Sequence, residues 1–141
     1  MNAPAERPLT DREYQSLAQF RAELRRFLSF SEAAARAEGL TPAQHQLLLA
    51  VRGSDAEGLT PSLIDIAEHL QLKLHSAGEL VNRATEQGLV ERRADPADAR
   101  RVLVAATATG TELLERLSVL HRRELRRFRT DMSRLLDTLE E

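Results

Sequence analysis

Hydrogen-bonding side chains recur between residues 75 and 83, at positions that alternate with apolar ones. The polar members are His75, Ser76, Glu79, Asn82 and Arg83. The apolar members are Ala77, Leu80, Val81 and Ala84. If the apolar members of this helical pattern face a core, the polar ones point outward. Outward side chains of these types match base edges in the major groove of DNA, where asparagine suits adenine, arginine suits guanine or phosphate, and glutamate suits cytosine. The alternative is a helix face that is only solvated.

Cationic side chains gather shortly afterwards, in a stretch with the composition of a β-hairpin. They are Arg92, Arg93, Arg100 and Arg101. Arg100 lies near the predicted tip, where a long cation can enter the negative potential of a narrow minor groove. The other three suit phosphate contacts, which add salt dependence rather than sequence information. The alternative for Arg92 and Arg93 is a charged hairpin that protects an exposed edge strand.

The composition excludes several classes of chemistry. The 141-residue chain has no cysteine, which excludes disulfides, thiol catalysis and cysteine-ligated zinc. It has no glycine-rich phosphate loop, no nucleophile elbow and no supported pair of catalytic carboxylates, so we expect no enzyme. The histidines at 45, 69, 75 and 121 lack a tight ligand spacing, and we expect no metal and no cofactor.

Charge is distributed unevenly along the chain. The formal net charge is −2. Residues 54–68 hold acidic side chains without Lys or Arg, whereas residues 92–101 hold four arginines. A basic edge can therefore exist on an acidic protein. The N-terminus lacks the pattern of a signal peptide, and no segment approaches the ~20 apolar residues of a membrane span. We expect a cytoplasmic protein without membrane partners.

Apolar periodicity predicts a mostly α-helical chain with one small β-hairpin. After a disordered tail over 1–9, we expect helices over 10–37 and 42–52, a loop over 53–58, and a third helix that opens at Thr60-Pro61 and ends near Leu70. A fourth helix over 74–87 completes a helix-turn-helix, and strands within 89–105 form a wing. A long helix from 107 and a short terminal helix follow. The helix over 10–37 is longer than one small domain needs, which suggests a partner chain.

Several short motifs occur in a characteristic order. They are Leu80-Val81, Gly88, Asp95-Pro96-Ala97-Asp98-Ala99-Arg100 and Thr107-Ala108-Thr109-Gly110. In this order and spacing, over nearly the whole chain, they resemble the MarR family of bacterial transcription regulators. The resemblance implies a single domain over 10–141, with a winged helix-turn-helix lobe over 42–105 and dimerisation helices over 10–37 and 107–141. It also implies that Asp98 orients Arg100.

Three positions depart from the family pattern. Ala84 stands where a larger apolar residue is usual, and Lys73 stands where Ser or Thr commonly caps the recognition helix. Gly78 lies inside that helix at a cost of about 1 kcal/mol relative to alanine. We expect a recognition helix that is less rigid before it meets DNA.

The resemblance implies a sequence-specific regulator, more often a repressor, that binds a pseudo-palindromic operator in double-stranded DNA as a homodimer. In MarR-like repressors a small aromatic or phenolic ligand binds between the dimer helices and the lobe. Such a pocket could be lined by Phe20, Leu24, His45 and Leu49, although an ordinary core explains these residues better. The alternative function is a winged-helix protein-interaction module without specific DNA binding. The wing cations and Arg83 favour DNA, because such a module has no need of them.

Overall fold

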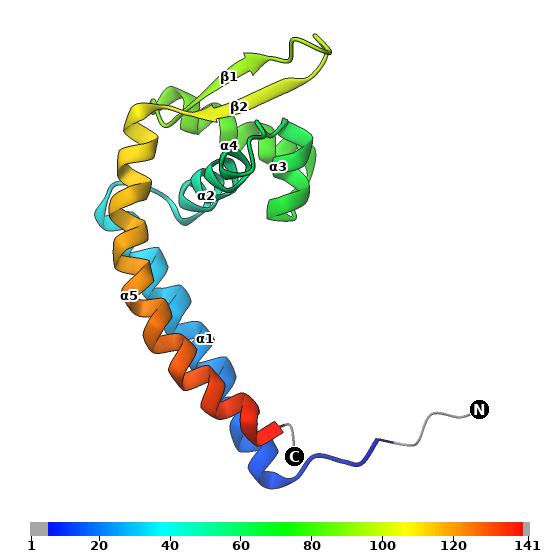
Figure 1. Ribbon diagram of the computed structural model, residues 1–141, viewed down its shortest axis with the longest axis vertical. Coiled ribbons are helices and arrows are strands. Elements are labelled where there is room, and N and C mark those ends of the chain that lie inside the picture. Colours follow the sequence, from blue (N-terminus) through cyan, green and yellow to red (C-terminus); the bar gives the residue numbers. More distant parts are fainter. Residues whose placement is uncertain (1–5, 140–141) are drawn as a thin grey trace, which may run out of the picture. The chain divides into compact units, whose positions relative to one another are not determined.

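The computed structural model describes residues 6–139, which form five helices and one antiparallel β-hairpin (Figure 1). These residues divide into two compact units. One, called here the helix-pair unit, consists of residues 6–31 and 121–139. The other, called the lobe, consists of residues 32–120. The fold class expected from the sequence, mostly α with a small hairpin in a winged helix-turn-helix order, is confirmed.

Two long helices contribute to both units. They are α1 (Asp11–Ala37) and α5 (Ala108–Leu139). The prediction of a separate short terminal helix is wrong, because α5 continues to Leu139. No glycine or proline follows Gly110, so nothing in the sequence breaks the helix. The predicted tail falls partly on residues 1–5, which lie outside the described residues; residues 6–10 precede α1 without helical structure. No helix in the described range is long and apolar enough to cross a membrane.

The N-terminus of α1 is fixed by local hydrogen bonds. Thr10 and Glu13 exchange backbone-to-side-chain bonds in a capping box, with distances of 3.1 Å and 3.2 Å. Arg7 Nη1 lies 2.6 Å from Glu13 Oε1. The bond from Arg7, followed by the Thr10 backbone N–H, lowers the pKa of Glu13 to about 2. The first turn of α1 is therefore held by a carboxylate that stays ionised in all but strong acid.

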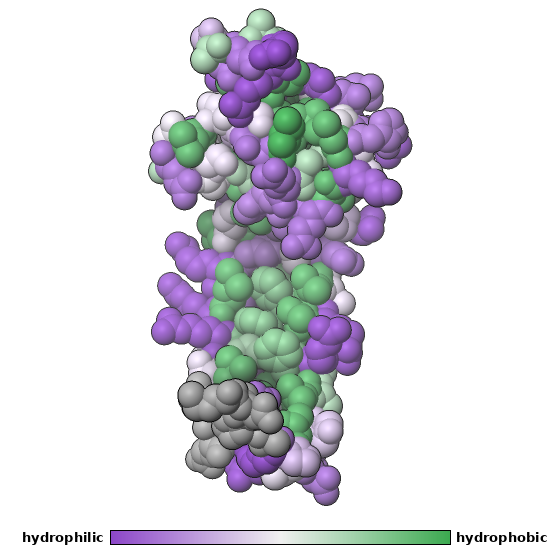
Figure 2. Space-filling model, turned by 90° about the vertical axis from the view of Figure 1, so that its right-hand side faces the viewer, coloured by the Kyte–Doolittle hydropathy of each residue, from purple (hydrophilic) through white to green (hydrophobic). Residues whose placement is uncertain are grey.

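The helix-pair unit has an aromatic centre and an apolar patch on its surface. Phe27 and Phe128 lie with ring centroids 5.2 Å apart, and the buried His121 Nε2 lies 2.8 Å from Ser31 Oγ. Large apolar side chains nevertheless remain exposed on this unit: Leu9, Tyr14, Leu17, Leu28, Leu125 and Leu136. Figure 2 shows hydrophobic surface gathered along its helices and bordered by hydrophilic side chains. A patch of this kind on a monomer marks an interaction surface.

Three shorter helices form the body of the lobe. They are α2 (Pro42–Ala56), α3 (Leu63–Leu70) and α4 (Leu74–Glu86). Thr41 and Gln44 form a capping box at the start of α2, which begins at the predicted residue 42. The prediction of a loop over 53–58 is wrong for residues 53–56, because these residues extend α2. Gly58 at φ +76°, rather than Gly53, supplies the left-handed residue that ends the helix, and Leu59 N–H closes on Ser54 O at 2.9 Å.

The start of α3 also differs from the prediction. The cap is Ser62 in a capping box with Asp65, rather than Thr60 before Pro61. Pro61 and Ser62 are extended because they join the sheet: Val104 N–H donates to Pro61 O at 2.9 Å, and Ser62 forms an antiparallel bridge with Leu103. Tertiary pairing thus displaces the local helix start and ties α3 to the hairpin.

The hairpin consists of β1 (Val90–Ala94) and β2 (Val102–Ala106), so it spans 90–106 where the sequence predicted 89–105. Val90 pairs with Ala106, and Ala94 pairs with Val102. Its inner residues join a core built from all parts of the lobe: Leu47, Leu48, Val51, Ile66, Val81, Val90, Val104, Leu114 and Leu117. Figure 1 shows the hairpin beside α4 and leading into α5.

The junction between β2 and α5 explains the Thr-x-x-Gly motif. Thr107 Oγ1 accepts from Gly110 N–H at 3.1 Å and donates to Gly88 O at 2.5 Å. A Cβ on Gly110 would lie 2.1 Å from Leu89 O, so no larger residue fits without moving the backbone. The motif therefore packs α5 directly against the chain that leaves α4.

Candidate nucleic-acid interface

The exposed face of α4 carries the polar side chains expected from the sequence. Ala77, Val81 and Ala84 are buried, and Leu80 is partly buried, as predicted. The five outward positions are all exposed: His75, Ser76, Glu79, Asn82 and Arg83. The cap residue Lys73 makes no side-chain capping bond, as its residue type implies. The helix thus presents donors and acceptors to solvent over three turns, as reading a groove requires.

Three of these polar residues already have partners. His75 Nε2 lies 3.2 Å from Glu79 Oε1, one turn further along α4. Asn82 Oδ1 accepts a hydrogen bond from Arg92 Nη2, which reaches across from β1. The same nitrogen lies 3.5 Å from Gly78 O. Arg92 is therefore held against α4, whereas the sequence indicated a phosphate contact or the protection of an exposed edge strand.

The wing tip positions Arg100. Asp98 Oδ1 accepts from the backbone N–H of Arg100 at 3.0 Å and from its Nε at 3.2 Å. These two bonds lower the pKa of Asp98 below its ordinary value, and the bond from the backbone N–H has the larger effect. The Arg100 side chain is nevertheless 93% exposed. The guanidinium is thus oriented through its Nε atom, while the rest of the group is exposed and can contact a partner.

Arg101 connects the wing to the start of α3. Its Nη2 lies 3.7 Å from Asp65 Oδ2, and its Nε lies 3.8 Å from Asp95 Oδ2. The pKa of Asp65 is lowered, first by the Ser62 backbone N–H and also by the charge of Arg101. The sequence indicated a phosphate contact for Arg101 and gave no sign of this bridge, because nothing local indicates that residue 65 lies beside residue 101.

Arg93 differs from its neighbour Arg92. Its Nη2 lies 2.5 Å from Glu91 Oε1 on the same strand. Half of its side chain stays exposed, so it keeps access to solvent at the edge of the hairpin. The wing arginines therefore fall into a pair bound to other elements, Arg92 and Arg101, and a pair bound only within the wing, Arg93 and Arg100.

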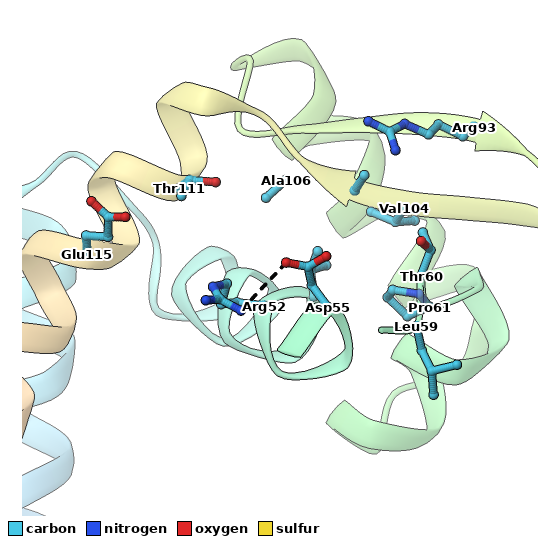
Figure 3. Close-up of a pocket in the computed structure, with 12 residues that line it drawn as sticks. Arg52, Asp55, Leu59, Thr60, Pro61, Arg93, Val104, Ala106, Thr111 and Glu115 are labelled. Atoms are coloured by element: carbon cyan, nitrogen blue, oxygen red, sulfur yellow. Dashed lines mark ion pairs between the residues drawn. The ribbon is translucent and has the colours of Figure 1, made fainter. Parts of the chain in front are cut away.

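A separate cavity lies within the lobe, beneath the hairpin (Figure 3). It measures about 360 Å³ and lies between the end of α2, residues 59–61, β2 and the start of α5. Arg52 and Asp55 form an ion pair of 3.6 Å on its α2 side, while Thr111 and Glu115 line it from α5. Because its lining carries both signs of charge, it favours no one class of ligand.

The residues proposed for a ligand pocket do not line that cavity. Phe20 and Leu24 belong to the helix-pair unit and are partly buried. His45 and Leu49 belong to the lobe, where His45 is buried and Leu49 is exposed. A ligand pocket formed by these residues stays a prediction. Within residues 6–139, no three His, Asp or Glu side chains gather as metal ligands would.

The family comparison matches the segment that contains this surface. A model of the MarR family matches residues 38–101, which run from the end of α1 to the end of the wing loop. The resemblance drawn from the sequence motifs is confirmed by this match. A LexA repressor from Magnetococcus marinus is 32% identical over 80 residues. That alignment covers 56% of this chain but only 34% of the LexA protein, so the two share one segment.

Solved structures share the fold. AbsC, a MarR family transcriptional regulator from Streptomyces coelicolor, superposes with a TM-score of 0.73 at 23% identity, covering 90% of this chain and 84% of AbsC. BpsR from Bordetella bronchiseptica, whose DNA binding is regulated by 6-hydroxynicotinic acid, gives 0.64 at 22% identity, covering 90% and 99%. At this identity the similarity establishes the winged-helix fold alone.

Proposed function

Because residues 38–101 match a model of the MarR family, we propose that the protein is a sequence-specific DNA-binding transcriptional regulator. The observation that carries the proposal is the Arg100 side chain, 93% exposed at the wing tip and oriented by Asp98. A solvent-exposed cation that is oriented in this way suits the negative potential of a narrow minor groove.

The lobe has the parts needed to contact two grooves. Helix α4 presents His75, Ser76, Glu79, Asn82 and Arg83 to the major groove, while the wing places Arg100 in a minor groove. Arg93 and Arg101 stay half exposed and supply phosphate contacts. The acidic net charge of the whole chain does not oppose this, because these arginines are concentrated in one segment.

The protein acts as a homodimer in this proposal. Leu28, Leu125 and Leu136 of the helix-pair unit are each more than 40% exposed in the single chain. A second copy would bury this apolar surface. Because duplex DNA is pseudo-symmetric, a two-fold dimer places one α4 in each of two successive major-groove turns of a pseudo-palindromic operator.

Repression and ligand control belong to the same proposal. The curated relative is named a repressor, and the regulated DNA binding of BpsR provides a precedent for a small aromatic ligand. A regulator of this type acts by binding DNA rather than by catalysis. We place it in the cytoplasm.

The test is selection of bound fragments from genomic duplex DNA by the purified full chain, followed by affinity measurements at two salt concentrations. The proposal predicts enrichment of pseudo-palindromic sequences and an affinity that falls steeply with salt, because bound phosphates release counterions. If no sequence is enriched above competitor DNA, the regulator proposal is wrong, and the winged-helix interaction module becomes the better account.

A further inference from the structure

The contact between Asn82 and Arg92 joins the recognition helix to the wing. Asn82 is exposed on α4, and Arg92 is exposed on β1. Arg92 Nη2 donates to Asn82 Oδ1 and approaches Gly78 O at 3.5 Å. These acceptors belong to residues one helical turn apart, so one nitrogen of the guanidinium contacts two successive turns of α4 at the surface proposed to face the major groove.

This contact fixes which groups of Asn82 remain available. A guanidinium has only donors, so the atom of Asn82 that it contacts must be the carbonyl oxygen. The amide NH₂ of Asn82 stays free, and it is a donor. The remaining N–H groups of Arg92 are donors as well. The pair therefore presents mainly donors to a base edge, because one of the two lone pairs of its single acceptor, Asn82 Oδ1, is already engaged by a cation.

Such a pair of donors distinguishes adenine from guanine in the major groove, because the two bases display different groups there. Adenine requires an acceptor for its N6 amino group together with a donor for N7, which a free asparagine provides. Guanine displays the acceptors N7 and O6 side by side, and it requires two donors. The Asn82 and Arg92 pair thus complements guanine, whereas Asn82 alone would suit adenine.

We propose that Asn82 and Arg92 act as one donor unit that selects guanine at one position of each operator half-site. This inference rests on the proposed DNA-binding function and specifies what one part of that surface recognises. Arg92 would then determine sequence, through the asparagine that it engages, rather than only add affinity through phosphate. A phosphate contact would weaken binding to all sequences alike when lost.

The test is selection from a library of randomised duplexes by the parent protein and by the Asn82→Ala, Arg92→Ala and Arg93→Ala variants. Arg93→Ala is the matched control, because it removes the same charge from the adjacent residue, which pairs with Glu91 and not with α4. All three substituted residues are exposed, and thermal unfolding followed by circular dichroism checks that each variant folds.

The expected result has three parts. The parent selects guanine at a position that loses its preference in Asn82→Ala. Arg92→Ala changes the preference at that position to adenine, with a shift of about ten-fold in the guanine-to-adenine affinity ratio, the size of one good base contact. Arg93→Ala weakens binding without changing the selected bases.

Three results would overturn the inference while leaving the regulator proposal intact. The first is selection of adenine by the parent at the Asn82-dependent position. The second is an equal loss for all sequences in Arg92→Ala. The third is a full set of preferences retained by Asn82→Ala. If the parent enriches no sequence, the proposed function fails and this inference fails with it.

Discussion

The pairing of the partly buried Asp98 with the exposed Arg100 orders a loop tip. Asp98 accepts from both the backbone and the side chain of Arg100, and its pKa is lowered in consequence. Because the folded-state pKa lies below the ordinary value of about 3.9, this pairing stabilises the wing tip above that pH. The contribution is lost as the pH falls through the lowered pKa.

A substitution separates the two bonds to Asp98. In Arg100→Ala the pKa of Asp98 should rise yet stay below its ordinary value, because the larger effect comes from the backbone N–H, which alanine retains. Titration of the side-chain carboxyl carbon by NMR measures both proteins. An Asp98 pKa at the ordinary value in the parent would contradict this description of the wing.

Two glycines should respond oppositely to alanine. Gly110→Ala places a Cβ 2.1 Å from Leu89 O, and we expect a loss of about 3 kcal/mol or more because backbone must move. Gly78→Ala meets only Leu63 Cδ2, at 3.9 Å, in a helix interior, and we expect a gain of about 1 kcal/mol. Urea denaturation of both variants and the parent measures the difference. Equal effects would show that the motif glycine has no packing role.

Residue types alone predicted which side chains of α4 are exposed, because helical periodicity assigns each position to a face. They could not predict that Arg92 contacts Asn82 or that Arg101 contacts Asp65. Each pair joins a strand to a helix, so its proximity depends on the packing of the hairpin. Long-range contacts of this type have no signal in local spacing.

At the scale of elements, the order was predictable and several boundaries were not. The capping box at Thr41 gave the start of α2 correctly, since it is formed entirely by neighbouring residues. The start of α3 was wrong because Pro61 and Ser62 pair with β2, a contact that overrides the local helix signal. The single long α5 was missed although no glycine or proline follows Gly110 within it.

The cap of α3 gives an element-scale prediction. Ser62 Oγ accepts from Asp65 N–H at 3.1 Å, and Ser62 is buried where the helix meets the sheet. Ser62→Ala should lower the free energy of unfolding by roughly 1 kcal/mol, the usual effect of losing an N-cap. Ser76→Ala, on the exposed face of α4, is the control and should have little effect. Equal values in thermal denaturation would argue against the cap.

At the scale of the whole molecule, the apolar surface of the helix-pair unit predicts self-association. A protein with both Leu28→Glu and Leu125→Glu should remain monomeric, because charges would have to be buried at the interface. Light scattering at micromolar concentration should give twice the chain mass for the parent. The control is Leu59→Glu, whose leucine is 61% exposed on the lobe and should not affect mass. A monomeric parent would exclude the dimer.

We propose that α4 and the wing bind DNA together. The most direct measurement is fluorescence anisotropy of one selected duplex with the parent, Arg100→Ala and Arg21→Ala at two salt concentrations. Arg21→Ala removes the same charge from an exposed position on α1. We expect the affinity of the parent for this duplex to fall steeply with salt. We expect the affinity of Arg100→Ala to be at least about ten-fold weaker and that of Arg21→Ala to be unchanged. Equal affinity of the parent and Arg100→Ala would contradict this proposal.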